Sequence, residues 1–223
     1  MSITVKPEKQ NADQQLINVE ALLQQLCKNV RVTKEGKVEI VDPSAPIDLA
    51  GCCCLKALIE SKFEVRIHPL AGPGSQLPFP GNIPIGAYGG GASAPTGAGS
   101  VLQPPVGGGK SQTGGGSDSD TFIDISDNNG KGYFVYDEQG NPINNPLFIT
   151  LGHELSGHAL NYARGTAART DKTREEQAIK AENEIRKSIK DGDSPKYSER
   201  VGEGAGRVGD PRTGVTERPP DKR

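Results

Sequence analysis

Apolar residues recur every three or four positions in three stretches of this chain, which predicts amphipathic helices. The helices are expected over 16–30, 48–61 and about 174–190. Between the first two, apolar and polar residues alternate over 31–41, which predicts a β-hairpin. The residues at 63–67 alternate again and predict a strand. The first third of the chain is therefore expected to form a helix, a hairpin, a helix and a strand, in that order.

The pattern of ordered structure resumes at about residue 120. Two runs rich in aromatic and β-branched residues, 121–125 and 132–137, flank an Asp-Asn-Asn-Gly turn, and we expect them to pair as a second hairpin. A helix is expected next, with Asn145 as its N-cap, Pro146 at its first position and Gly165 just past its end. This part of the chain predicts a hairpin followed by a helix with clear boundaries.

Composition separates ordered parts of the chain from flexible ones. Only 33% of the residues are hydrophobic, and 29 Gly with 17 Pro make up about a fifth of the chain, so the whole chain is not expected to be compact. Flexible segments are expected over 1–15, over the Gly/Pro/Ser-rich stretch 70–118 and over the charged tail 191–223. The parts at 16–69 and 119–190 are then expected to form one small α+β domain.

Charge and hydropathy exclude several classes of partner. The net charge is −2, with acidic and basic residues in balance, so neither nucleic acid nor an acidic membrane is indicated. No apolar run approaches the roughly 18 residues that span a bilayer, and residues 1–15 have no apolar core of a signal peptide. The four cysteines, Cys27, Cys52, Cys53 and Cys54, match neither a disulfide framework nor a zinc spacing, so buried, reduced thiols are expected.

The helix expected over 146–165 carries the chemistry that stands out most. It holds His153, Glu154 and His158, one residue longer than the His-Glu-x-x-His pattern of zinc peptidases. On a regular α-helix, residues five apart point about 140° away from each other. A one-residue π-bulge at Ser156-Gly157 would return both imidazoles to one face, and glycine makes such a distortion cheap. The spacing is therefore compatible with a metal site.

Two surface histidines on an amphipathic helix are the alternative interpretation. Apolar residues beside the histidine pair, and a carboxylate pair on the later helix, favour the metal site, since a carboxylate is the usual third zinc ligand. That pair is Glu175 and Glu176, and Glu176 with Thr173 is also expected to form a capping box. The hairpin before the histidine helix is expected to offer an edge strand to an extended peptide. The remaining histidine, His68, is expected to be structural.

These motifs resemble two groups of zinc enzymes. The sequence His-Glu-Leu-Ser-Gly-His at 153–158 resembles the His-Glu-Leu-Leu-Gly-His motif of the dipeptidyl-peptidase zinc family, which shares the extra residue. The wider arrangement is similar to the zincin domains of bacterial effectors and toxins. Their pattern Glu-x-x-Ala-Ile/Val-x-x-Glu-Asn-x-Ile-Arg matches 175–186, and the resemblance extends over 48–68 and 119–200. It implies a small zincin-like α+β domain with an active-site helix and a ligand-bearing helix.

The resemblance also implies roles for individual residues. Glu175 is favoured as the third zinc ligand, with Glu176 as the alternate, while Glu182 and Asn183 are expected to orient a ligand. Tyr197 is expected to stabilise an oxyanion. With Zn²⁺ bound, Glu154 is expected to act as the base in peptide-bond hydrolysis.

The function expected from these residues is that of a zinc metallopeptidase, acting as a secreted bacterial effector or toxin on a protein of a target or host cell. Such a protein is made in the bacterial cytoplasm and exported without a classical signal peptide. It has a protein or peptide substrate, and a secretion apparatus or a cognate immunity protein as further partners. The competing hypothesis is a non-catalytic effector or phage-tail-like cargo with a degenerate zincin fold, and the inserted residue motivates it.

Overall fold

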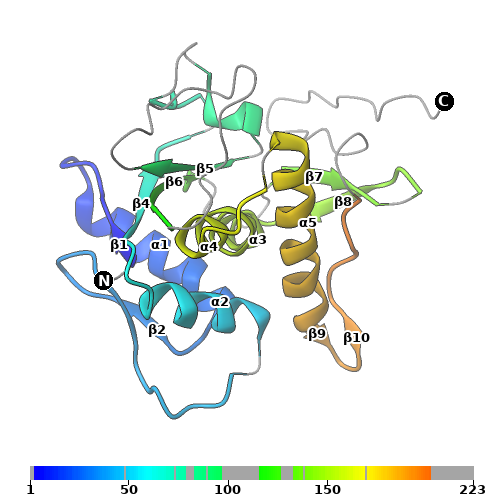
Figure 1. The fold of residues 1–223 in the computed structure, drawn as a ribbon, viewed down its shortest axis with the longest axis horizontal. Helices are drawn as coiled ribbons and strands as arrows, with labels where there is room; N and C mark the ends of the chain where they lie inside the picture. The colour runs from blue at the N-terminus through cyan, green and yellow to red at the C-terminus, as the bar shows by residue number, and fades with distance from the viewer. Residues whose placement is uncertain are drawn as a thin grey trace.

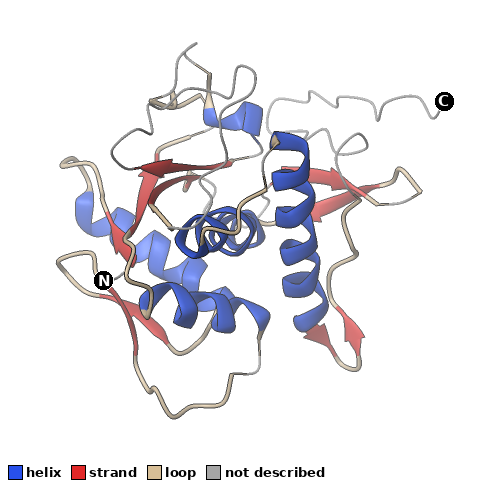
Figure 2. Cartoon of the chain, viewed as in Figure 1, coloured by secondary structure: helices blue, strands red, loops and turns tan. Residues whose placement is uncertain are grey.

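The structure of this chain is a computed structural model. It describes residues 3–47, 49–72, 74–78, 83–88, 90–96, 116–126, 133–137, 139–168 and 170–201. A helix through residues 147–164 lies at the centre, between a small sheet on one side and a long helix on the other (Figure 1). Helices and strands are mixed along the chain, as Figure 2 shows, so the α+β class expected from the sequence is confirmed.

Four strands form the largest sheet. Its order is β1 (Ile3–Val5), β4 (Val65–Leu70), β6 (Asp118–Asp124) and β5 (Gly91–Thr96). β4 runs parallel to both β1 and β6, whereas β5 runs antiparallel to β6. Every second side chain of β4 is buried, because alternate positions of a strand face opposite sides of the sheet. One face of the sheet therefore packs on the central helix.

The N-terminal helices and hairpin form in the order that the sequence predicts, but the first helix lies four residues earlier than expected. Residues 1–15, which were expected to be flexible, contain strand β1 and the start of this helix. Helix α1 spans Ala12–Leu26 and helix α2 spans Ala50–Ile59. Between them, β2 (Val30–Val32) and β3 (Val38–Ile40) pair as an antiparallel hairpin. Its turn places Gly36 at a φ of 81°, a conformation that glycine adopts without strain. The apolar faces of both helices enter the main core together with Val65 and Ile67 of the sheet.

The central helix is continuous but changes its winding. It consists of α3 (Leu147–Gly152), the π-helical segment η2 (His153–Ala159) and α4 (Leu160–Arg164). It ends at Gly165 with a φ of 68°, as the sequence predicts. Every residue of α3 is buried, because the sheet, α1 and α5 surround it. A helix covered in this way needs apolar residues all round, which explains the run of Leu, Phe and Ile in α3.

The remaining described elements are a 3₁₀ helix, a long helix and two hairpins. They are η1 (Ile85–Tyr88), α5 (Asp171–Ser188), the hairpin of β7 (Tyr133–Tyr136) with β8 (Pro142–Asn145), and the short hairpin of β9 (Lys190–Asp191) with β10 (Ser194–Pro195). Helix α5 crosses the central helix and makes its most extensive contact with η2 (Figure 1).

Three sequence expectations in this region are wrong. The strand expected at 121–125 does not pair with 132–137: β6 lies between β4 and β5, and β7 pairs with β8 instead. Asn145 ends β8, so the helix N-cap is Pro146 rather than Asn145. The capping box of α5 is formed by Thr170 and Thr173, one turn before the expected one. Turn and cap residues indicated breaks in the chain correctly but did not identify strand partners.

Part of the segment expected to be flexible is folded. Within 70–118, the structure places η1 and strand β5, whose six residues pair with β6 along their full length. Residues 97–115 lie outside the described part of the chain, so the expectation for them is not tested. The tail expected from 191 begins with the β9–β10 hairpin and remains described to Val201. Small residues such as those of β5 can form a strand when a neighbouring strand supplies the hydrogen bonds.

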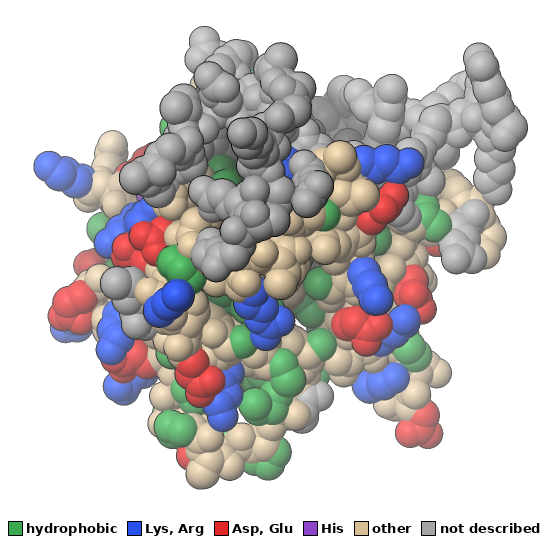
Figure 3. Space-filling model, in the orientation of Figure 1, with side chains coloured by type: hydrophobic (Ala, Val, Ile, Leu, Met, Phe, Trp, Pro, Cys, Tyr) green, Lys and Arg blue, Asp and Glu red, His purple; other side chains and the backbone are tan. Residues whose placement is uncertain are grey.

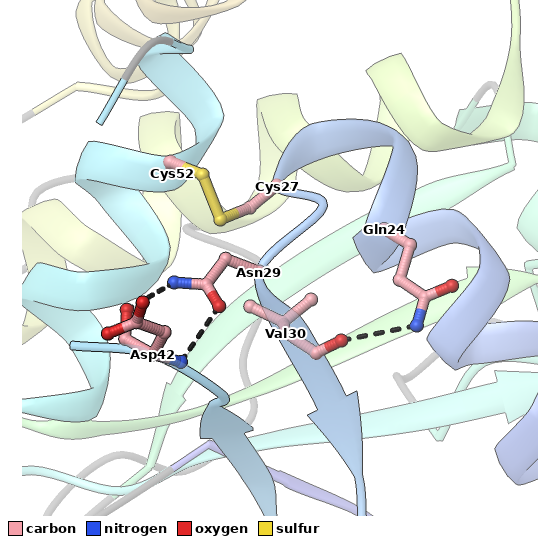
Figure 4. The surroundings of a disulfide bond; sticks show 6 residues. All are labelled: Gln24, Cys27, Asn29, Val30, Asp42 and Cys52. Atoms are coloured by element: carbon pink, nitrogen blue, oxygen red, sulfur yellow. Dashed lines mark hydrogen bonds between the residues drawn. A yellow bond between two sulfur atoms is a disulfide. The ribbon is translucent and has the colours of Figure 1, made fainter. Parts of the chain in front are cut away.

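Two cysteines form a disulfide, contrary to the expectation of four reduced thiols. Cys27 at the end of α1 is bonded to Cys52 in α2, while Cys53 is exposed and free and Cys54 is buried and free (Figure 4). Beside the bond, the Asn29 side chain donates to the carbonyl of Asp42 and accepts from its N–H (Figure 4). The expectation considered only bonds between neighbouring cysteines, which form poorly. Cys52 instead pairs with Cys27, which lies 25 residues earlier in the sequence.

Charge is spread evenly over the visible surface. On the face drawn in Figure 3, acidic and basic side chains lie interspersed over the described residues rather than gathered by sign. This agrees with the net charge of −2. None of the helices in the described ranges combines the length and apolarity needed to span a bilayer.

Removing the disulfide should lower the stability of the fold. The double substitution Cys27→Ala with Cys52→Ala is expected to reduce the free energy of unfolding by roughly 3–4 kcal/mol, because the bond closes a loop of 25 residues in the unfolded chain. Denaturant unfolding followed by circular dichroism measures the change. Cys53→Ala removes an exposed free thiol and should change stability by less than about 0.5 kcal/mol. Equal stabilities of the double variant and the parent in non-reducing buffer would contradict the bond.

Candidate metal centre

The π-helical segment brings the two histidines to one side of the central helix. The N–H of Leu160 donates to the carbonyl of Leu155, five residues back, which is the hydrogen bond of a π-helix. Because the winding is wider there, side chains five positions apart come near one another. The rings of His153 and His158 have centroids 5.1 Å apart. The π-bulge expected from the six-residue motif is therefore confirmed.

Helix α5 supplies a carboxylate to the same point. Oε2 of Glu175 lies 3.5 Å from Nε2 of His153 and 3.4 Å from Nε2 of His158. Ligand atoms of all three residues lie within 4.8 Å of one another. Ligands held by zinc at about 2.0–2.1 Å in a tetrahedron lie about 3.3–3.4 Å apart. These three side chains, called the ligand group below, are therefore a group that could hold a metal ion.

The neighbouring glutamate does not reach the ligand group. Glu176 is half exposed and its carboxylate lies 4.0 Å from Lys172 on the outer side of α5. Of the two carboxylates between which the sequence left a choice, only Glu175 faces the histidines. The capping role assigned to Glu176 is also absent, because Thr170 and Thr173 form that box.

A buried carboxylate orients the first histidine. Glu182 is fully buried, and its Oε2 lies 2.9 Å from Nδ1 of His153. A carboxylate in this position accepts a hydrogen bond from Nδ1 and fixes the orientation of the ring, so that Nε2 points to Glu175. Glu182 therefore contacts a residue of the ligand group, as the sequence analysis expected. By contrast, Nδ1 of His158 is buried without a hydrogen-bond partner among the described residues.

Close charges keep the acidic groups of the site ionised. Burial lowers the pKa of His153, but the charge and hydrogen bond of Glu175 outweigh it and raise the pKa to about 10. Burial raises the pKa of the Glu175 carboxyl, but the charge of His153 and then that of Arg200 hold it far below its ordinary value. For Glu182, Arg200 likewise outweighs burial and brings the pKa to about 2. Both carboxylates are therefore ionised at neutral pH.

Glu154 lies beside the ligand group and against the sheet. Its side chain is 4% exposed, and its Oε2 is buried without a hydrogen-bond partner among the described residues. A Cβ added at Gly91 of strand β5 would lie 2.9 Å from Cγ of Glu154. The glycine thus allows the edge strand to approach this carboxylate. A buried carboxylate oxygen without a partner is costly in a fold, which makes it a candidate for a role in chemistry.

Two other expected site residues do not contact the ligand group. The ring of Tyr197 packs edge-on against Phe148, with centroids 5.8 Å apart, and belongs to the margin of the main core. The role of Tyr197 in stabilising an oxyanion therefore has no support from its position. Asn183 contacts no ligand either. Its side chain binds the backbone of Arg200 on both sides, accepting from the N–H and donating to the carbonyl.

The structure adds two residues that the sequence analysis missed. Tyr162 stacks on His158 with centroids 6.3 Å apart, and burial raises the pKa of its phenol to about 12. Its position four residues after His158 on the same helix was a usable signal. Arg200 donates to Glu182 at 3.0 Å and to Glu175 at 3.2 Å. It lies in the segment expected to be a disordered tail, where no periodicity points to it.

Comparison with known proteins gives no match for this chain among family models, curated proteins or solved structures. What the chain does is therefore inferred from the ligand group and its contacts.

Packing at Gly157 sets the distance between the π-helical segment and α5. A Cβ at this position would lie 2.4 Å from both Cα and Cβ of Ala178, so backbone would have to move. Gly157→Ala is therefore expected to lower the free energy of unfolding by roughly 1–3 kcal/mol and to weaken zinc binding, because α5 carries Glu175. Chemical denaturation and zinc titration measure the two effects.

Gly74→Ala is the matched control for Gly157→Ala. A Cβ at Gly74 meets nothing within 4 Å, so this variant should keep both the stability and the zinc affinity of the parent. If Gly157→Ala behaved like Gly74→Ala, the close approach of the two helices would not hold the site together.

Proposed function

We propose that this chain is a zinc-dependent peptidase in which His153, His158 and Glu175 hold the metal. One observation carries the proposal: Nε2 of both histidines lies within 3.5 Å of the same oxygen of Glu175, close to the ligand separation of a tetrahedral zinc ion. Two imidazoles with one carboxylate form a ligand set of catalytic zinc, whereas calcium and magnesium prefer oxygen ligands throughout. Three protein ligands leave a fourth position for water or substrate.

Glu154 is the residue that we propose moves protons in this reaction. Zinc supplies Lewis acidity, which polarises a peptide carbonyl and lowers the pKa of a water toward about 7. Glu154 accepts a proton from the attacking water on its unpartnered carboxylate oxygen and passes it to the amine that leaves. Its neighbours in the motif and its burial beside β5 keep the carboxylate in place for both transfers.

The edge of the sheet supports a peptide as the substrate. Among the described strands, β5 pairs only with β6, so its other edge has no strand partner. Its first residue, Gly91, touches the side chain of Glu154. An extended peptide that adds to this edge would pass beside the proposed base. This strand replaces the hairpin at 121–137 that the sequence had suggested for the same purpose.

An exported effector or toxin is the biological setting we propose. The Cys27–Cys52 disulfide supports it, because such bonds persist mainly in oxidising compartments. A protein of a target or host cell is then the substrate, and a secretion apparatus or a cognate immunity protein remains a proposed partner. The non-catalytic alternative rested on the inserted residue of the histidine motif. Because η2 takes up that residue and both imidazoles still face Glu175, the insertion no longer favours it.

Metal analysis tests the ligand group directly. The purified protein is expected to contain one zinc per chain, and His153→Ala or His158→Ala should each remove it. Elemental mass spectrometry measures the metal content. His68→Ala is the control, because His68 is bound to Asp120 and stacked on Phe122 away from the ligand group. Zinc that persisted in both ligand variants would place the metal elsewhere and defeat the proposal.

Glu154→Gln separates metal binding from catalysis. The amide keeps the size of the side chain but cannot accept the water proton, so peptide cleavage should fall at least about 100-fold while zinc content stays unchanged. Cleavage of a degenerate peptide library followed by mass spectrometry provides the rate. Glu176→Gln changes an exposed carboxylate of α5 and should leave the rate unaltered. Full activity of Glu154→Gln would rule out Glu154 as the base.

A further inference from the structure

The chain after α5 folds back onto the metal centre. Residues 196–201, called the return segment below, follow the β9–β10 hairpin and are tied to α5 by backbone contacts. The N–H of Lys196 donates to the carbonyl of Ile189 at 2.8 Å. At the other end, the N–H of Val201 donates to the carbonyl of Tyr136 at 3.1 Å. Both ends of the return segment are therefore fixed to the folded domain.

One side chain of α5 hydrogen-bonds the backbone of the return segment next to the ligand group. The N–H of Arg200 donates to Oδ1 of Asn183, and the Asn183 amide donates to the Arg200 carbonyl, each at 2.8 Å. This pair of hydrogen bonds fixes where the side chain of Arg200 starts. Since Asn183 directly follows Glu182, the same turn of α5 carries the carboxylate and holds the backbone of the arginine that contacts it.

The guanidinium of Arg200 is buried between two carboxylates. Its Nη1 lies 3.0 Å from Oε2 of Glu182 and its Nη2 lies 3.2 Å from Oε1 of Glu175. The side chain is 9% exposed, and its Nε is buried without a partner among the described residues. A planar guanidinium can hold two carboxylates at fixed positions, which a lysine ammonium on a flexible stem cannot do equally well.

The two oxygens of Glu175 therefore have different partners. Oε2 faces both histidines, whereas Oε1 faces Arg200. Without Arg200, the carboxylate could rotate and offer both oxygens, or neither, to a metal. Glu182 would also lose one of the cations that balance its buried charge, and it is the residue that orients His153. Two ligands out of three thus depend on one arginine.

We propose that Arg200 is a positioning residue of the metal centre, which holds Glu175 in a single-oxygen orientation and keeps Glu182 on His153. This inference rests on the proposed function, because it assigns zinc to the ligand group. It makes the return segment a part of the active site. Residues that hydrogen-bond a metal ligand without binding the metal themselves contribute about 10–100-fold to metal affinity.

Two substitutions of Arg200 test the proposal with metal alone as the probe. Arg200→Gln removes the positive charge. Arg200→Lys keeps the charge but loses the planar guanidinium that contacts two carboxylates at once. Both are expected to weaken zinc binding by about 10–100-fold in competition with a chelating dye. The visible absorption bands of the Co²⁺-substituted protein should also change, because they report coordination geometry. Asn183→Ala keeps the guanidinium but removes the two hydrogen bonds that hold the backbone of Arg200. It should therefore produce a smaller loss of zinc affinity.

Lys187→Gln is the matched control. Lys187 also connects α5 to the return segment, through Glu199 at 3.3 Å, but it contacts no ligand. This variant should keep the zinc affinity and the Co²⁺ spectrum of the parent. Thermal unfolding of the metal-free proteins identifies any variant that fails to fold, in which case Arg200→Lys and Asn183→Ala carry the test.

The possible outcomes separate the two proposals. If the parent binds no zinc, the proposed function and the role of Arg200 both fail. If the parent binds zinc and the Arg200 variants bind it equally well or more tightly, only the positioning role fails. A lower melting temperature with unchanged affinity and an unchanged Co²⁺ spectrum also overturns it, because the arginine would then be only structural.

Discussion

The carboxylate of Glu182 is the interaction on which the site and its surroundings depend. It is fully buried and meets His153 of the π-helical segment, Arg186 of its own helix and Arg200 of the return segment. Arg186 in turn binds the carbonyl of Asn144 at the end of strand β8. A buried charge is tolerated only when its partners are in place, and loss of one partner is strongly destabilising. This single group therefore connects the strand, both helices and the return segment around the ligand group.

Charge balance explains why such a network can be buried at all. Glu175 and Glu182 bring two negative charges, and Arg186 and Arg200 bring two positive ones. Oε1 of each carboxylate faces an arginine and Oε2 faces a histidine, while Oε2 of Glu182 also accepts from Arg200. The arginines consequently neutralise the carboxylates without occupying the space between the imidazoles. A cation can enter that space while the surrounding ion pairs remain intact.

The sequence predicted those parts of the fold that depend on local rules. Gly165 ends the central helix because glycine adopts the required conformation freely. The hairpin at 30–40 follows from alternation of apolar and polar residues, and the π-bulge follows from helix geometry. Pairing in the four-stranded sheet was not predicted, since alternation in 118–124 does not identify a partner and β5 is built from small residues in a glycine-rich stretch. The Cys27–Cys52 bond and Arg200 depend on contacts between residues distant in sequence, and spacing carries no signal for either.

The extra residue of the histidine motif also shapes the packing on both sides of the central helix. The widened turn packs against α2, which carries the buried thiol of Cys54, and its Gly157 lies against Ala178 of α5. A π-turn is wider than an α-turn, and here the added width meets a helix on each side instead of leaving a void. The small residues at 157 and 178 let α5 approach closely enough for Glu175 to reach both imidazoles. The inserted residue of the histidine motif thus helps to set the distance between Glu175 and the two imidazoles.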